Sequence, residues 1–103
     1  MSVRIGINGF GRMGRLGMRA GWNREAFDFV RVNEIAGTAA CSAHLLQFDS
    51  VHGTWDRECR AEGEQILVGD KAIGHSGNAD IADTDWSGCD IVIEATGKHH
   101  KKP

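Results

Sequence analysis

A glycine-rich turn near the start of the chain constrains the fold more than any other feature. Residues 8–14 read Asn-Gly-Phe-Gly-Arg-Met-Gly and follow a short apolar run at Val3–Ile7. In such a turn the first glycine permits a sharp bend, the second lets the backbone approach a pyrophosphate, and the third lets a helix pack closely on a sheet. Glu34 follows 20 positions after Gly14, as expected of an acid that binds a ribose. The pattern predicts a dinucleotide-binding βαβ unit.

The glycine spacing is weak support when taken alone. The chain holds 14 glycines in 103 residues, so chance supplies a Gly-x-Gly-x-x-Gly in about one such chain in four. Its context makes it specific, because a predicted strand precedes it, a predicted helix follows it and an acid lies at the right distance. The helix start would offer free N–H groups and the positive end of its dipole to phosphates.

Composition excludes several classes of protein. The chain is 41% hydrophobic and 25% charged, as in a soluble globular protein, and its length suits one small domain or part of a larger one. A net charge of −2 gives no general attraction to nucleic acid or to anionic membranes. No apolar run reaches the roughly 18 residues of a membrane span. Three scattered cysteines do not indicate a disulfide framework, so we expect a reduced, cytoplasmic chain.

The rest of the chain predicts an α/β fold built on a Rossmann-type parallel sheet. Parallel strands are expected at residues 3–8, 27–32 and 90–94. Short strands separated by turn residues indicate an antiparallel excursion around residues 58–74, and the polar segment 75–85 is expected to be a loop. A complete doubly wound sheet has about six parallel strands. We therefore expect an incomplete sheet and a truncated chain.

Two helices are expected to cover this sheet, at residues 11–22 and 39–48. Thr38 is a candidate cap for the second helix. Apolar residues at helical spacing are expected to face the sheet. They are Met13, Leu16 and Ala20 in the first helix and Cys41, Leu45 and Phe48 in the second.

Four segments of the chain carry a further pattern. Residues 3–15 hold the first predicted strand and the glycine turn, residues 27–34 hold the second strand and Glu34, residues 48–53 read Phe-Asp-Ser-Val-His-Gly, and residues 90–97 read Asp-Ile-Val-Ile-Glu-Ala-Thr-Gly. In order and spacing these segments resemble one enzyme family, the glyceraldehyde-3-phosphate dehydrogenases. They are similar to its first strand and glycine turn, its second strand with a ribose-binding acid, its Tyr/Phe-Asp-Ser-x-His-Gly turn, and its strand ending in Glu-Ser/Ala-Thr-Gly. The resemblance implies that residues 1–103 are the N-terminal part of an NAD-binding domain and that the catalytic domain is absent.

The resemblance also implies a set of cofactor-binding residues. Backbone N–H groups of Arg12 and Met13 would donate to the NAD pyrophosphate, although Arg12 could instead cap a carboxylate. Glu34 would hold the adenosine ribose, and its charge would repel a 2′-phosphate and so favour NAD over NADP. Thr96 and Gly97 would pass near the nicotinamide-side ribose. The complete candidate set is Asn8, Gly9, Phe10, Gly11, Arg12, Met13, Glu34, Thr96 and Gly97.

The chemistry of the family would need residues that lie beyond Pro103. In the family, a His-activated cysteine within a Ser-Cys-Thr-Thr-Asn-Cys stretch attacks the aldehyde, a hydride passes to NAD, and phosphate cleaves the thioester. No catalytic residue is therefore assigned, and the chain alone is expected to be inactive. The implied parent is an NAD-dependent phosphorylating aldehyde dehydrogenase of glycolysis, a homotetramer whose substrate is a small phosphorylated aldehyde.

Several alternatives stay open at this point. Residues 43–46 and 81–90 look closest to a bacterial subgroup linked to arsenate detoxification, in which arsenate would replace phosphate. A non-catalytic dinucleotide-binding fragment and another Rossmann oxidoreductase are the competing functions. Cys41 and His44 form a Cys-x-x-His pair without a second pair, so we expect helix packing rather than a metal site. Cys89 precedes a predicted core strand and is expected to be a structural thiol.

Overall fold

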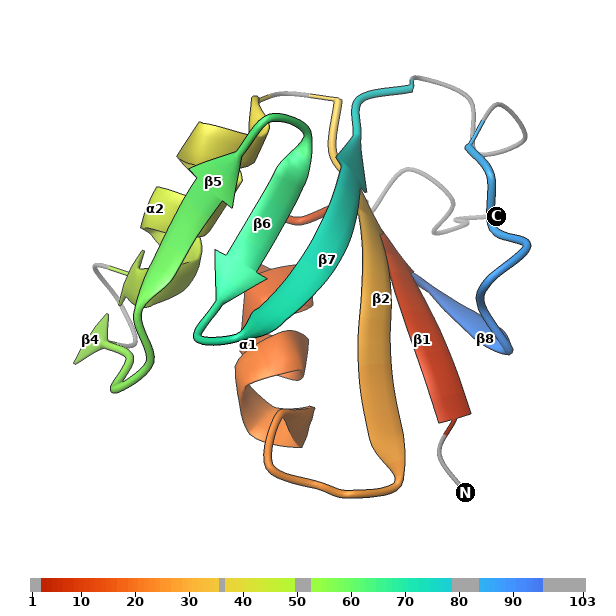
Figure 1. Cartoon of the computed structure of the whole chain (residues 1–103), viewed down its shortest axis with the longest axis horizontal. Coiled ribbons are helices and arrows are strands. Elements are labelled where there is room, and N and C mark those ends of the chain that lie inside the picture. Colours follow the sequence, from red (N-terminus) through yellow and green to blue (C-terminus); the bar gives the residue numbers. More distant parts are fainter. Residues whose placement is uncertain (1–2, 36, 50–52, 79–83, 96–103) are drawn as a thin grey trace, which may run out of the picture.

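The computed structural model describes residues 3–35, 37–49, 53–78 and 84–95 (Figure 1). Within these residues the elements, in chain order, are β1 (Val3–Asn8), α1 (Arg12–Gly21), β2 (Phe27–Asn33), α2 (Ala39–Gln47), β3 (Phe48–Asp49), β4 (Gly53–Thr54), β5 (Cys59–Glu62), β6 (Gln65–Val68), β7 (Lys71–Ser76) and β8 (Ile91–Glu94). Six of the described strands form one sheet in the order β5-β6-β7-β2-β1-β8. The predicted Rossmann-type α/β fold is confirmed.

The sheet joins a parallel part to an antiparallel one. Strand β1 pairs in parallel with β2 and β8, and β2 pairs in parallel with β7. Strands β5, β6 and β7 are antiparallel neighbours, which is the predicted excursion around residues 58–74. The predicted loop at residues 75–85 starts two residues too early, because His75 and Ser76 belong to β7. These polar residues are accommodated in a strand because each side chain hydrogen-bonds to a neighbouring element.

Helix α1 packs on the sheet through Gly14, as the glycine turn predicts, but not through its predicted apolar residues. The buried residues are Gly14, Met18 and Gly21, whereas Met13 is 68% exposed. The reason is close approach, since a Cβ at Gly14 would lie 2.4 Å from the Gly9 carbonyl oxygen and one at Gly21 would lie 3.1 Å from the Phe29 ring. A helix that packs through glycines places its backbone, rather than its larger apolar side chains, against the sheet.

The buried face of helix α2 is also not the predicted apolar one. Cys41, Leu45 and Phe48 are exposed, and the buried residues of this helix are Ala39, Ser42, Ala43 and Leu46. Small residues on that face allow α2 to pack on β5 and β6. The predicted cap is confirmed, because Thr38 Oγ1 accepts a hydrogen bond from the Cys41 N–H at 3.2 Å.

Both described helices cover the same face of the sheet and enclose the core between the two layers (Figure 1). The core residues are Ile5, Ile7, Phe10, Met18, Phe29, Val32, Ala39, Ala43, Leu46, Cys59, Ile66, Val68 and Ile73. Of the two described helices, neither has the length and apolar character needed to cross a membrane. On the other face Trp86 and Cys89 lie over Gly6, where a Cβ would come within 2.7 Å of both side chains.

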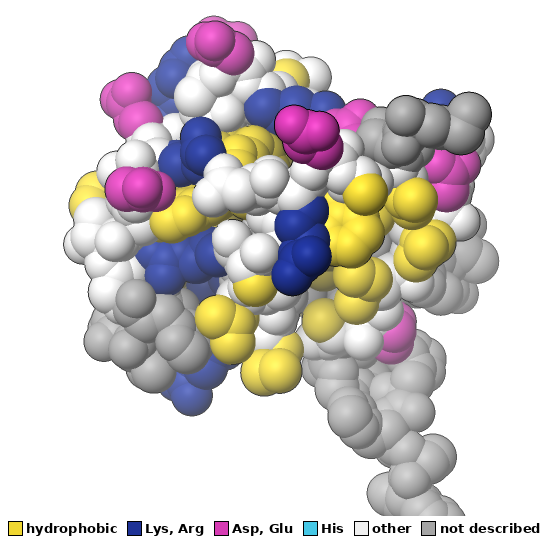
Figure 2. All heavy atoms as spheres, turned by 90° about the horizontal axis from the view of Figure 1, so that it is seen from below, with side chains coloured by type: hydrophobic (Ala, Val, Ile, Leu, Met, Phe, Trp, Pro, Cys, Tyr) yellow, Lys and Arg dark blue, Asp and Glu magenta, His cyan; other side chains and the backbone are white. Residues whose placement is uncertain are grey.

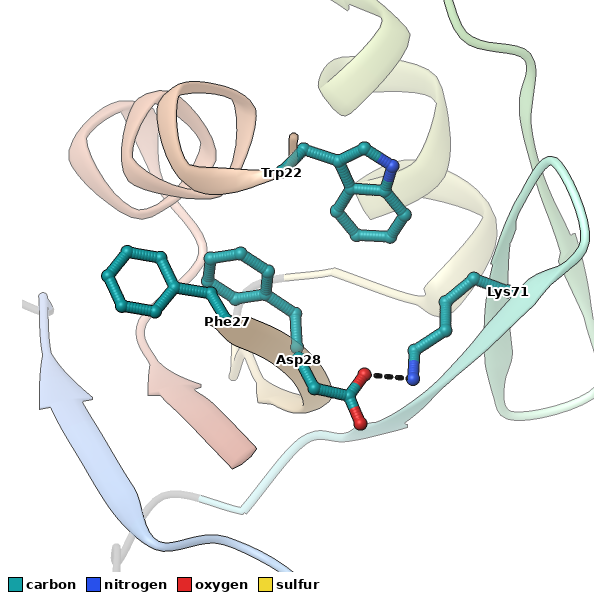
Figure 3. A pocket seen from close by; sticks show the side chains of 5 residues that line it. Trp22, Phe27, Asp28 and Lys71 are labelled. Atoms are coloured by element: carbon teal, nitrogen blue, oxygen red, sulfur yellow. Dashed lines mark hydrogen bonds and ion pairs between the residues drawn. The ribbon is translucent and has the colours of Figure 1, made fainter. Parts of the chain in front are cut away.

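A hollow of about 220 Å³ lies where β2 and β7 begin, at the lower end of the sheet in Figure 1. It is lined by three aromatic side chains and by an ion pair between Lys71 and Asp28 (Figure 3). The face of the molecule seen from below mixes apolar side chains with both basic and acidic ones (Figure 2). Neither described helix begins at this hollow, and its Lys71 is already paired with Asp28.

Candidate dinucleotide-binding site

The predicted site residues lie where three parallel strands end, at the upper end of the sheet in Figure 1. The chain leaves β1 for β2 on one side and later returns to β8 on the other side of β1. The carboxyl end of β1 is therefore a topological switch point. Open α/β sheets bind ligands in the crevice beside such a point.

The glycine turn that follows β1 is fixed by two of its three glycines. Gly9 has a φ of 96°, which only glycine adopts without strain, and its N–H donates to the Asn33 carbonyl at 2.7 Å. Gly14 presses against the Gly9 carbonyl, as described above. A Cβ at Gly11, by contrast, would meet nothing among the described residues within 4 Å. The fold itself does not require Gly11, and the open space beside it suits the approach of a pyrophosphate.

The start of α1 presents backbone donors to this open space. The Arg15 N–H bonds to the Gly11 carbonyl at 3.0 Å, so the N–H groups of Arg12, Met13 and Gly14 have no acceptor within the helix. Gly11 supplies no side chain to cap them, and the described first turn of α1 contains no acidic residue. These features favour an anion at the helix start.

Glu34 lies over the glycine turn. Its Oε1 accepts a hydrogen bond from the Phe10 N–H at 2.5 Å, and its own N–H donates to the Ser76 carbonyl at 2.8 Å. The carboxylate borders a cavity of about 180 Å³ between α1 and α2. Residues that line this cavity are Phe10, Gly11, Arg15, Glu34, Gly37, Cys41, Ser42 and Leu45. An acid, a glycine turn and a helix start are thus brought to one cavity.

A polar network centred on the buried Asn8–Asn33 pair joins the ends of the strands at this site. Asn33 Nδ2 donates to Asn8 Oδ1 at 2.9 Å, and Asn8 Nδ2 donates to Glu94 Oε1 at 2.9 Å. Asn33 Oδ1 accepts from the Ser76 hydroxyl at 2.8 Å and from the Asn78 N–H at 2.9 Å. The network connects β8, β1, β2 and β7. Satisfied buried networks of this kind fix local geometry.

Most of the predicted set converges on this site. Asn8, Gly9, Phe10, Gly11, Arg12, Met13 and Glu34 lie together at the strand ends, whereas Thr96 and Gly97 lie outside the described residues. Phe10 is only 2% exposed, so it takes part in the site through its N–H, which donates to Glu34. The Asn8 side chain is hydrogen-bonded within the polar network. Sequence reasoning missed Asn33 and Ser76. The signal for Asn33 was a polar residue at the end of a buried strand.

Cys59 and Cys89 add no reactive group to this site. Burial raises the pKa of the Cys59 thiol to about 11, and partial burial raises the pKa of Cys89. Both thiols therefore stay protonated near neutral pH, as expected of structural cysteines. The described residues contain no group of three or more His, Cys, Asp or Glu side chains placed to hold a metal ion.

His75 makes folding stability depend on pH. Burial lowers the pKa of its imidazole, and Arg31 lowers it further, while Glu34 and Glu64 oppose the shift. Because the folded-state pKa lies below the unfolded value of about 6.5, the unfolded chain takes up more protons as the pH falls below that value. Stability is therefore full above pH ~6.5 and declines below it. We expect the urea concentration at the unfolding midpoint to be lower at about pH 5.5 than at about pH 7.5. This decrease should be smaller in His75→Gln. An equal fall in both proteins would contradict this assignment.

The switch point, the glycine turn at a helix start and the acid after β2 together define a dinucleotide-binding domain of the Rossmann class. The family model for the glyceraldehyde 3-phosphate dehydrogenase NAD binding domain matches residues 3–102. The chain belongs to this family, and NAD is the cofactor of the domain.

Named relatives agree with this assignment. The chain is 50% identical over 100 residues to glyceraldehyde-3-phosphate dehydrogenase 3 of Nostoc sp., a match that covers 95% of this chain and 30% of that protein. It is 43% identical over 104 residues to glyceraldehyde-3-phosphate dehydrogenase 1 of Bacillus subtilis, which covers 99% of this chain and 31% of that protein. The chain therefore spans about a third of the length of these relatives.

Proposed function

We propose that this chain holds NAD for a phosphorylating glyceraldehyde-3-phosphate dehydrogenase. The observation that carries the proposal is the 2.5 Å hydrogen bond from the Phe10 N–H to Glu34 Oε1, which places an acid directly above the glycine turn. In this assignment the N–H groups of Arg12 and Met13 hold the pyrophosphate, and Glu34 holds the hydroxyls of the adenosine ribose. The exposed side chain of Ile35, next in the chain, offers an apolar surface to the adenine.

The charge of Glu34 favours NAD over NADP in this proposal. The carboxylate accepts hydrogen bonds from ribose hydroxyls but repels a 2′-phosphate. Arg15 also lines the cavity, and its Nη1 donates to the Phe10 carbonyl at 3.2 Å, which ties it to the glycine turn. NAD is therefore expected to bind more tightly than NADP.

The proposed parent enzyme oxidises a small phosphorylated aldehyde. NAD supplies the hydride acceptor for such a reaction. The residues of this chain bind and orient the cofactor, and the nucleophile and its base belong to the remainder of the parent enzyme. The family resemblance supports a homotetrameric parent. A binding fragment without catalysis is the alternative for the 103-residue chain.

Isothermal titration calorimetry of the 103-residue chain with NAD and with NADP tests the proposed function. We expect saturable binding of NAD, weaker binding of NADP, and no reduction of NAD when glyceraldehyde 3-phosphate and phosphate are added. Absence of NAD binding by a folded chain would contradict the proposal. Turnover by the chain alone would contradict the division of roles between it and the rest of the parent.

We further propose that the parent accepts arsenate in place of phosphate. The support is the likeness of residues 43–46 and 81–90 to a bacterial subgroup linked to arsenate detoxification. Initial rates of the full-length parent with each anion test this point. A parent that prefers phosphate strongly would contradict it.

A further inference from the structure

A buried Ser–His pair lies between α2 and β7 and has no part in the cofactor-binding roles assigned so far. Ser42 is 3% exposed and His75 is 7% exposed. Ser42 Oγ lies 3.0 Å from His75 Nε2, within hydrogen-bond distance. Burying two polar side chains costs free energy that their mutual hydrogen bond only offsets. The pair therefore adds little net stability to the contact between α2 and the sheet, and we look for a role that depends on its geometry.

The pair lies in the wall between two openings. Ser42 lines the cavity that Glu34 borders. His75 lines a larger neighbouring hollow of about 560 Å³, together with Thr38 and Asn78. Gly37 lines both openings. Gly37 and the first turns of α2 therefore lie between the proposed ribose cavity and the neighbouring hollow. The Ser42–His75 hydrogen bond holds these first turns against β7.

The same segment of β7 also fixes the ribose-binding acid. The Ser76 carbonyl accepts the Glu34 N–H at 2.8 Å, and the Ser76 hydroxyl donates to Asn33 Oδ1 at 2.8 Å. One residue earlier, His75 contacts α2. The end of β7 therefore connects both sides of the cavity, with Glu34 on one side and the first turns of α2 on the other.

We propose that the Ser42–His75 hydrogen bond is a positioning contact for the dinucleotide. It holds the first turns of α2 against β7, so that the wall opposite Glu34 stays at the distance that a ribose requires. Both residues act through α2 and Glu34 and are positioning residues rather than catalytic ones. This inference rests on the proposed function, because it assumes that the Glu34 cavity receives the adenosine ribose.

Calorimetric titration of NAD into variants of the 103-residue chain tests this role. Ser42→Ala removes the hydrogen bond and releases the first turns of α2 from β7. We expect the Kd for NAD to rise about fivefold, because binding must then order the cavity wall. His75→Gln keeps a polar atom near the position of Nε2. We expect its Kd to stay within about twofold of the unmodified chain.

Gln47→Ala is the matched control. Gln47 lies at the other end of α2, and its Oε1 accepts the Cys59 N–H at 2.9 Å. Its loss also loosens α2 from the sheet but leaves the cavity wall intact. We expect a lower Tm and an unchanged Kd for NAD. Equal weakening by Gln47→Ala and Ser42→Ala would show a merely structural role and overturn the inference.

The remaining outcomes separate the two proposals. Equal NAD affinity in the unmodified chain and in Ser42→Ala overturns the positioning role alone. No NAD binding by the unmodified chain overturns the proposed function as well. Where circular dichroism shows that Ser42→Ala is unfolded at the assay temperature, Ser42→Cys replaces it, because a thiol is similar in size and a much weaker hydrogen-bond partner. A Kd unchanged in Ser42→Cys then overturns the inference.

Discussion

Replacing Glu34 by Gln is expected to raise the Kd for NAD about tenfold, which corresponds to about 1.4 kcal/mol of binding free energy. The amide keeps the length of the side chain and still accepts the Phe10 N–H, so the glycine turn retains its geometry. What is lost is the charge, which strengthens hydrogen bonds from the ribose hydroxyls. The same loss removes the repulsion of a 2′-phosphate, so the ratio of NADP to NAD affinity should rise.

Calorimetry with both dinucleotides measures this effect, and Glu25→Gln is the control. Glu25 is an exposed acid in the connection between α1 and β2, at the opposite end of the sheet from the strand ends that carry the site. Its replacement makes the same change in net charge and should leave both affinities unchanged. A Glu34→Gln chain with unaltered NAD affinity would show that the acid does not contact the ribose.

Replacing Gly14 by Ala is expected to lower the free energy of unfolding by about 3 kcal/mol, the upper part of the range for overpacking. The new Cβ would lie 2.4 Å from the Gly9 carbonyl oxygen and 3.2 Å from the Ile7 side chain. The first neighbour is backbone and cannot rotate away. Either α1 moves off the sheet or the glycine turn shifts, and each change displaces the N–H donors at the helix start. We therefore expect NAD binding to weaken together with stability.

Gly17→Ala in the same helix is the matched control. Gly17 is exposed, and a Cβ there would meet no described atom within 4 Å. Alanine favours a helix over glycine by about 1 kcal/mol, so this variant should be more stable than the unmodified chain. Urea unfolding compares the two variants. A stable Gly14→Ala chain with normal NAD affinity would contradict the packing described for the turn.

The sequence predicts the order of elements well but not the faces of the helices. Apolar spacing points to Met13 and Leu45 as inward residues, yet both are exposed. The physical reason is that these helices approach the sheet through small residues, such as Gly14 in α1 and Ala43 in α2. Periodicity of large apolar side chains cannot reveal a contact made by backbone and Cβ atoms.

The glycine turn and Glu34 could be predicted because each carries a local requirement of the βαβ unit. The network around Asn33 could not. Its other members include Asn8 and Ser76, which bond to Asn33, and Glu94, which bonds to Asn8. They come from separate strands, and their contacts arise only when β1, β2, β7 and β8 align. His75 illustrates the same limit, because its partner Ser42 lies 33 positions away on a helix.

Amide NMR spectra of the labelled 103-residue chain during titration with NAD test the central claim most directly. We predict the largest shift changes at the amides of Phe10–Met13 and Glu34, because the donors at the start of α1 and the acid lie together at the ends of β1 and β2. Amides of Phe27 and Lys71, beside the hollow at the other end of the sheet, should remain unchanged. Shifts centred on that hollow, or none at saturating NAD, would contradict the assignment of the cofactor site.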